Sequence, residues 1–305
     1  AVGAATTATT AFAASSVKTG MTFDSSMSQV MATMGYSVDE LNKDGSEASK
    51  TFETLRKFAM EMGSTTAFSA SESADALNYM ALAGYDAETS MKMLPNVLNL
   101  AAAGGIELAS ASDMVTDAQS ALGLTLDETS ELVDKMAKAS SKSNTSVAQL
   151  GEAILTVGGT AKNLAGGTTE LSTALGILAD NGVKGAEGGT ALRNIILSLG
   201  APTDKAAKLM SSLGLEVYDA NGNMRPLNET FGDLDAILST MTQGEQTQVL
   251  NSIFNKVDLK SVNALLANTG ERFDELSGYI DNATGAAENM AAVQLDNLSG
   301  DMTLF

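Results

Sequence analysis

The sequence predicts an all-α protein, a compact globular block of many short helices. Small and flexible side chains dominate the 305 residues, with 28 Gly, 16 Met, no Trp and only 5% aromatic residues. This composition favours closely packed short helices over a sandwich or barrel, whose strands are rich in aromatic and β-branched residues. Helix start and stop signals recur at short intervals, and 44% hydrophobic residues are enough to fill the cores.

One segment departs from this pattern. Residues 213–227, LGLEVYDANGNMRPL, alternate in polarity and contain Asn221 and Gly222, a strong two-residue turn signal. We expect a small β-hairpin there. No heptad pattern is sustained over three or four repeats, so the sequence does not predict a coiled-coil shaft.

The N-terminal run AVGAATTATTAFAASSV (1–17) is uncharged. Its Thr and Ser content makes a poor bilayer span, and a basic n-region is missing. We interpret residues 1–20 as a linker or helix that enters the folded part, the alternative being the end of a membrane-active segment lying upstream. Helices are expected over about residues 22–33 and 47–62, on either side of a charged loop.

Residues 62–103 show how the helices are delimited. Ser69 followed by Glu72 is a capping box, in which hydroxyl and carboxylate each accept a hydrogen bond from a free backbone N–H. Gly84 is placed to end this helix, and Asp86 to cap the next. The expected inward faces are Ala74, Leu77, Ala81 and Gly84 in the first helix, and Met91, Leu94, Val97, Leu98 and Ala101 in the second.

Similar signals continue along the chain. Pro95 is expected to start or kink a helix. Ser110 and Asp113 are expected to start a helix that Gly123 ends, and Asp127 to cap the next. Later start signals are Ser146 with Gln149, and Thr168, whose helix has the inward face Leu171, Ala174, Leu175 and Leu178. Further helices are expected over about 228–240, 243–254, 259–268, 272–281 and 286–305.

We divide the chain into the entering segment 1–20, a helical core 21–200, and a C-terminal helical part 201–305 that includes the hairpin and that we expect to continue beyond Phe305. The core suggests an internal duplication of 62–123 and 140–200. Ser69 matches Ser146 at an offset of 77, and the pair Leu100 and Ala101 matches Leu178 and Ala179 at 78. Chance similarity within an Ala, Leu, Ser and Gly alphabet is the alternative.

Composition excludes several classes of function. The 37 acidic and 18 basic residues give a net charge of −19, which argues against direct binding to nucleic acid or to an anionic membrane. Zero Cys removes thiol catalysis and thiolate metal sites, and zero His removes the commonest general base and metal ligand. We therefore expect no catalytic, cofactor-binding or metal-binding residues, and a protein that is not an enzyme.

Three groups of residues could still carry chemistry, and each has a structural interpretation. The run of Gly182, Gly185, Gly188 and Gly189 lacks the order of a phosphate loop, so we expect tight turns and close helix approach. Arg193 is expected to pair with an acidic neighbour or a loop carbonyl. The pairs interpreted as caps and solvated faces are Glu72 with Asp75, Glu128 with Glu131, and Asp233 with Asp235. Asp219, Asn221 and Asn223 resemble a calcium loop, but its bidentate Glu is missing, so a turn is favoured.

The methionines include Met60, Met62, Met80, Met91 and Met93. Their flexible thioethers fill irregular spaces, so we expect most of them to pack the core. The alternative is that some of them face another subunit.

Several strings, in their order and spacing, resemble the core region of phage tail tape measure proteins. They are FDSSMSQVMA (23–32), AMEMGSTTAFSASESADALNYMALAG (59–84), LPNVLNLAAA (94–103), GVKGAEGGTALR (182–193), residues 213–227, Ile253 with Phe254, and GAAENMAAVQLDNLSG (285–300). One departure is Asn255, where the family often has Gly.

The resemblance implies a structural protein of the virion, in the tail tube lumen or at the tail tip, that takes part in tail length determination, tail assembly and genome ejection. It implies self-association, a trimer as the first expectation, and contacts with the tail tube protein, tail tip or baseplate hub proteins and tail assembly chaperones. An extended helix of 305 residues would reach ~460 Å. This segment is broken too often to be that rod, so we expect a folded block.

Two other functions are alternatives. A membrane-active or channel-forming module would use small-residue helices, such as residues 1–17 or 147–161, to help the genome cross the host envelope. A cell-wall hydrolase, which this family sometimes carries, is disfavoured by the residue inventory.

Overall fold

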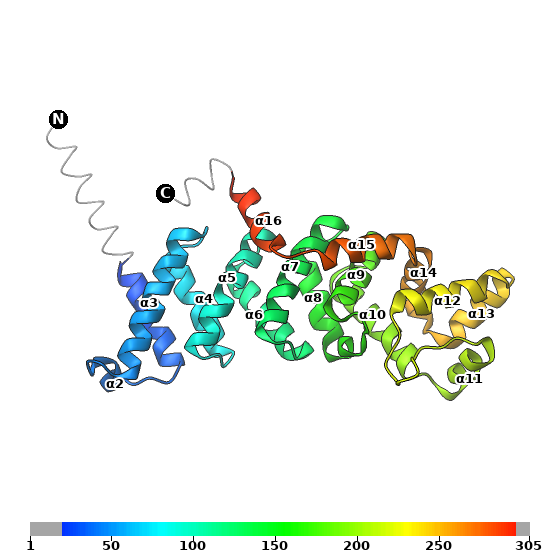
Figure 1. Ribbon diagram of the computed structural model, residues 1–305, viewed down its shortest axis with the longest axis horizontal. Coiled ribbons are helices and arrows are strands. Elements are labelled where there is room, and N and C mark those ends of the chain that lie inside the picture. The colour runs from blue at the N-terminus through cyan, green and yellow to red at the C-terminus, as the bar shows by residue number, and fades with distance from the viewer. Residues whose placement is uncertain (1–19, 297–305) are drawn as a thin grey trace. The chain divides into compact units, whose positions relative to one another are not determined.

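The computed structural model describes residues 20–296, which are helical apart from short connections (Figure 1). No β-strand occurs among them, so the predicted all-α class is confirmed. Of the helices that lie wholly within the described residues, the longest, α3, has 19 residues. The described chain forms two compact units, one of residues 20–116 and 291–296 and one of residues 117–290. The predicted domain limits and duplication stay predictions.

The first unit is a set of helical hairpins. Its helices are residues 20–33, α2 (Val38–Asn42), α3 (Glu47–Thr65), α4 (Ala70–Leu82), α5 (Ala87–Gly104) and the start of α6 (Leu108–Leu122). The helices α3, α4 and α5 pack on one another. Side chains without measurable exposure fill the core, among them Met27, Met31, Leu55, Leu77, Met80 and Leu94.

The second unit holds the larger set of helices. They are α7 (Leu126–Lys142), α8 (Val147–Val157), α9 (Gly167–Asp180), α10 (Gly185–Gly200), α11 (Asp204–Leu213), α12 (Leu227–Ser239), α13 (Gln243–Ile253), α14 (Leu259–Ala267), α15 (Glu271–Asp281) and the start of α16 (Ala286–Leu295). Short 3₁₀ turns, Gly158–Asn163 and Lys256–Asp258, precede α9 and α14. Helix α8 packs on α10, and α9 packs on α7, α14 and α15.

Local caps explain where many of these helices begin. Ser69 and Glu72 form the predicted capping box at α4, Asp86 caps α5 as predicted, and Ser146 caps α8. Further capping boxes join Ser37 to Glu40, Thr125 to Glu128 and Thr242 to Glu245. Each satisfies backbone N–H groups that the first turn leaves without a helical partner, so these boundaries are encoded within four residues of sequence.

These caps should make stability depend on acidity. The backbone N–H and then the hydroxyl of Thr125 lower the pKa of Glu128, and the hydroxyl and then the N–H of Thr242 lower that of Glu245. A lowered pKa contributes stability that is present above the ordinary value of 4.5 and is lost as the pH falls through the folded value. We therefore expect the chain to lose stability below about pH 4.5.

A double variant, Glu128→Gln with Glu245→Gln, tests this. Glutamine keeps a neutral capping box but does not titrate, so the variant should lose less stability than the parent between about pH 4.5 and pH 3. Urea unfolding followed by circular dichroism measures both losses. Equal losses in the two proteins would contradict the expectation.

The predicted β-hairpin is wrong. Leu213 ends α11 and Leu227 begins α12, so the helices take up both ends of the segment. The remaining residues form a single bridge between Tyr218 and Met224 around a turn at Gly222 (φ 84°). Two backbone hydrogen bonds of 2.8 Å flank the turn, and Pro226, which has no N–H, follows directly. The arms are too short to become strands.

Some boundaries also differ from prediction. Pro95 does not start a helix, since α5 runs through it from Ala87; the alternative prediction, a kink at Pro95, stays a prediction. A proline forfeits one helical hydrogen bond, and the buried neighbours Leu94 and Val97 hold the helix on both sides. Asp127 lies in the first turn of α7, because Thr125 makes the capping box with Glu128 instead.

Two further starts are earlier than predicted. Helix α6 begins at Leu108 rather than at Ser110. Helix α9 begins at Gly167, and Thr168 does not cap it. No side chain at the N-cap position, Gly166, caps α9; the carboxylate of Glu170, within the helix, accepts from the N–H of Gly166 instead. Residues 1–17 lie outside the described residues, and so does the end of the helix expected over 286–305. Within the described residues, α16 ends at Leu295.

Candidate functional site

The carboxylate pairs that the sequence offers for acid–base chemistry are used in caps and ion pairs. Glu72 and Glu128 lie in capping boxes, and Glu131 pairs with Lys135 at 3.2 Å. Asp233 accepts from Arg225 at 2.7 Å. Asp75 and Asp235 are exposed. The three pairs therefore act as caps and solvated faces in this fold.

The glycine run lies at a close helix contact. Gly182 follows α9 with a left-handed φ of 75°, and Gly185, Gly188 and Gly189 lie inside α10. A Cβ atom at Gly189 would be 2.3 Å from the carbonyl oxygen of Ala153 in α8. The run thus lets two helix backbones approach, as predicted for close helix packing.

The other candidate residues also contact the protein itself. Arg193 donates from Nη1 to the carbonyl oxygen of Thr156 at 3.3 Å; this carbonyl lies in the last turn of α8 rather than in a loop. The carboxylate of Asp219 accepts from the backbone N–H groups of Asn221 and Asn223, both at 2.8 Å, as an Asx turn does. These bonds lower the pKa of Asp219, that from Asn223 most. Within residues 20–296, no three His, Cys, Asp or Glu side chains are placed to hold a metal ion.

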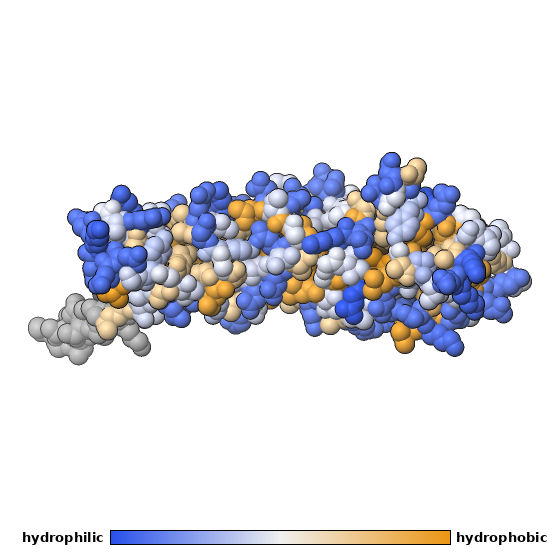
Figure 2. Space-filling model, turned by 90° about the horizontal axis from the view of Figure 1, so that it is seen from below, coloured by the Kyte–Doolittle hydropathy of each residue, from blue (hydrophilic) through white to orange (hydrophobic). Residues whose placement is uncertain are grey.

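The methionines divide between core and surface. Met80 and Met93 are buried, Met62 and Met91 are half-buried, and Met60 is 51% exposed. Figure 2 shows that the apolar surface on one face of the molecule is broken into small patches among hydrophilic side chains. No helix in the described part of the chain combines the length and the apolar character needed to cross a bilayer.

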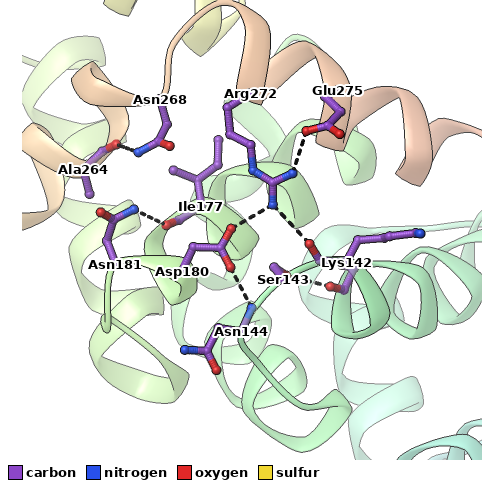
Figure 3. Close-up of polar contacts among 11 residues, drawn as sticks. Lys142, Ser143, Asn144, Ile177, Asp180, Asn181, Ala264, Asn268, Arg272 and Glu275 are labelled. Atoms are coloured by element: carbon purple, nitrogen blue, oxygen red, sulfur yellow. Dashed lines mark hydrogen bonds and ion pairs between the residues drawn. The ribbon is translucent and has the colours of Figure 1, made fainter.

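A polar cluster around Arg272 joins three helices of the second unit (Figure 3). The Nη2 atom of Arg272 donates to Asp180 at 2.9 Å and to the carbonyl oxygen of Lys142 at 3.1 Å. Its Nη1 atom donates to Glu275 at 2.9 Å. Asp180 also accepts from the N–H of Asn144 at 2.7 Å. Lys142 and Asp180 are the last residues of α7 and α9, so Arg272 on α15 brings a cation to two helix C-termini.

These contacts raise the pKa of Arg272, the hydrogen bond to Asp180 contributing most. The guanidinium therefore keeps its charge and its fixed fork of donors. Since the side chain is still 32% exposed, the cluster sets helix positions more than it adds stability.

Two buried or half-buried carboxylates make comparable links. Asp134 on α7 accepts from the N–H of Gly285 at 2.8 Å and that of Ala287 at 3.0 Å, which caps the start of α16. Glu170 is 4% exposed and accepts from the N–H of Gly166 at 2.9 Å and from that of Leu227. Burial raises the pKa of Glu170, and the two N–H groups act in the opposite direction. Glu170 thereby ties the start of α9 to that of α12.

Sequence reasoning missed Arg272, Asp134 and Glu170. Each of them has a partner 57 to 153 residues away, and no local sequence pattern indicates such a pair. A cavity of about 810 Å³ lies between the end of α10 and the turn at residues 218–226.

The polar groups described above, those of Arg272, Asp134 and Glu170, fix helices against one another. This is the chemistry of a structural part.

Comparison with known proteins agrees with this. The family model of phage-related minor tail proteins matches residues 56–255, about two thirds of the chain. The chain belongs to this family. This tail protein is thus a structural component of a phage tail, and the resemblance to tape measure proteins is confirmed.

Two curated relatives carry the tape measure name. The tail protein is 33% identical to the tape measure protein of Pneumococcus phage Dp-1 over 288 residues, which are 94% of this chain and 24% of the relative. It is 27% identical to the probable tape measure protein of Escherichia phage P2 over 290 residues, which are 94% of this chain and 34% of the relative. The chain thus spans about a quarter and a third of their lengths. No solved structure matches it.

Proposed function

We propose that these residues are a folded, non-enzymatic block of a tape measure protein, and that the length-measuring part of the protein lies elsewhere. The proposal is carried by the shortness of the helices: those that lie wholly within the described residues have at most 19 residues. The relatives of the chain are nevertheless named tape measure proteins. A ruler requires an extended chain, and frequent caps and turns prevent extension here. The block contributes to tail length determination, tail assembly and genome ejection as a structural part.

The proposal includes a place and partners. The block lies in the tail tube lumen or at the tail tip, and in the host cytoplasm during assembly. It associates with itself, a trimer being the first expectation, and with the tail tube protein, tail tip or baseplate hub proteins and tail assembly chaperones. The net charge of −19 supports partners other than nucleic acid.

Tail length in the phage that encodes this chain tests the proposal. A 20-residue helical insert between Asn221 and Gly222 enters an exposed turn of a folded block. We expect no change in tail length by electron microscopy. In an extended ruler, the same insert would add ~30 Å, at about 1.5 Å per residue.

The matched control places the same insert in the parent protein outside these 305 residues. There we expect the tail to lengthen by ~30 Å per 20 residues. Lengthening from the insert at Asn221 would show that the block itself is part of the ruler, and would overturn the proposal.

A further inference from the structure

The helices between residues 70 and 213 follow a regular period. The first helix of each pair begins at Ala70, Leu108, Val147 and Gly185, and the second begins at Ala87, Leu126, Gly167 and Asp204. Successive starts are therefore about 38 residues apart, within the ~34 to 47 residues of two-helix repeats in other proteins. The offset that relates Ser69 to Ser146 in the sequence corresponds to two of these periods.

The packing inside each unit follows the repeat. In the second unit, α7 contacts α9 and α8 contacts α10, so equivalent helices of neighbouring pairs lie against each other. In the first unit, α3 contacts α5 in the same way, and their starts at Glu47 and Ala87 keep nearly the same spacing. In a row of repeats, each helix pair contacts only the neighbouring pairs. Because few contacts join distant pairs, such a row can open in steps rather than all at once.

One segment breaks this local pattern. Residues 259–290, which we name the return strap, run back along the row (Figure 1): α14 contacts α10 and α9, and α15 contacts α9 and α7. The strap thus contacts one helix from each of three successive pairs, α7, α9 and α10, all of which lie in the second unit. Contacts at a separation of 92 to 153 residues link its residues to α7 and α9.

The strap is held by apolar and polar contacts together. Phe273, Leu276 and Ile280 form the buried face of α15. A Cβ atom at Gly176 of α9 would be 2.9 Å from Leu276, so the two helices lie very close. The ammonium group of Lys142 lies 4.6 Å from the ring centroid of Tyr279. The polar contacts are those of Arg272 and Asp134, described above.

We propose that the return strap is a releasable clasp that closes a row of two-helix repeats. While the strap is docked, α7 and α9 are held together; when it leaves, the helix pairs keep only their neighbour contacts and open one after another. The purpose of such a device rests on the proposed function, since a folded block that leaves through a narrow tube must open first. Opening in steps avoids unfolding a whole domain in one event.

Hydrogen exchange of the 305-residue chain, followed by mass spectrometry, tests the clasp. The variant Arg272→Ala removes the links to Asp180 and Lys142. We expect exchange in 126–142, 167–180 and 271–290 to rise by about threefold, as for loss of a partly exposed ion pair. The interface between α8 and α10 should change less, and residues 20–116 should not change.

The matched control is Arg225→Ala. Arg225 pairs with Glu229 and Asp233, only four and eight residues away, so its loss should raise exchange only in about 216–233. If Arg272→Ala fails to fold, Asp134→Asn carries the test, with the rise expected in 126–142 and 283–290. A uniform rise over 117–290, or no rise in 126–142, would overturn the proposal. Tail length plays no part in this measurement, so its outcome is separate from that of the proposed function.

Discussion

A methyl group added at Gly189 is expected to lower the free energy of unfolding by about 3 kcal/mol, the upper part of the usual range for overpacking. The Cβ atom of alanine would lie 2.3 Å from the carbonyl oxygen of Ala153 and 2.7 Å from Cβ of Thr156. The first obstacle is backbone, so it cannot turn aside as a flexible side chain would. Helices α8 and α10 would have to separate.

The control is the same change at Gly278, in the middle of α15. No atom lies within 4 Å of a Cβ built there. Alanine should therefore stabilise this helix by ~0.5–1 kcal/mol, its advantage over glycine in helix interiors. Urea unfolding of both variants measures the difference. Effects of the same sign would contradict the close approach at Gly189.

The second large effect is expected for Leu276→Ala. This substitution should lower the free energy of unfolding by about 2–5 kcal/mol, the range for truncating a buried leucine. Leu276 has no measurable exposure and lies in the buried face of α15. Truncation leaves a cavity against α9 that rigid helices fill only in part.

A double variant locates this effect. Gly176→Ala alone should destabilise, because its Cβ would lie 2.9 Å from Cδ2 of Leu276 and 3.0 Å from the hydroxyl of Ser143. With Leu276→Ala already present, part of that space is free, so the added alanine should cost less. Additive free energies in the double-mutant cycle would show that the two side chains do not meet. Val257→Ala, at a side chain 84% exposed, should change stability by less than ~0.5 kcal/mol.

The fold was largely predictable because its boundaries are local. Ser69, Asp86 and Ser146 act within one helical turn, so a single sequence contains the signal and its target. The predicted helix 243–254 differs by one residue from α13 for the same reason, since Thr242 and Glu245 form its capping box. The wrong β-hairpin at 213–227 shows the limit of local patterns. The sequence does alternate in polarity there, but the neighbouring helices α11 and α12 include both ends of the segment.

The linking residues were not predictable. An Arg272 that donates to the last carbonyl of α7 and to Asp180, or a Glu170 that accepts from Leu227, looks in the sequence like any charge on a helix. Only the tertiary fold brings their partners within hydrogen-bond distance. The two-helix period was also hidden, because the helices of successive pairs differ in length and in cap, and only their starts recur at a nearly constant spacing.

The capping boxes have a consequence for recovery after opening. A box such as Thr125 with Glu128 requires no other part of the chain, so each helix can re-form at its own boundaries once the chain is released. Helices of this length are only marginally stable alone, so they must also dock on their neighbours, a search over short sequence distances that is fast compared with pairing distant strands. Because the contacts of the return strap span 92 to 153 residues, we expect the strap to dock last during refolding.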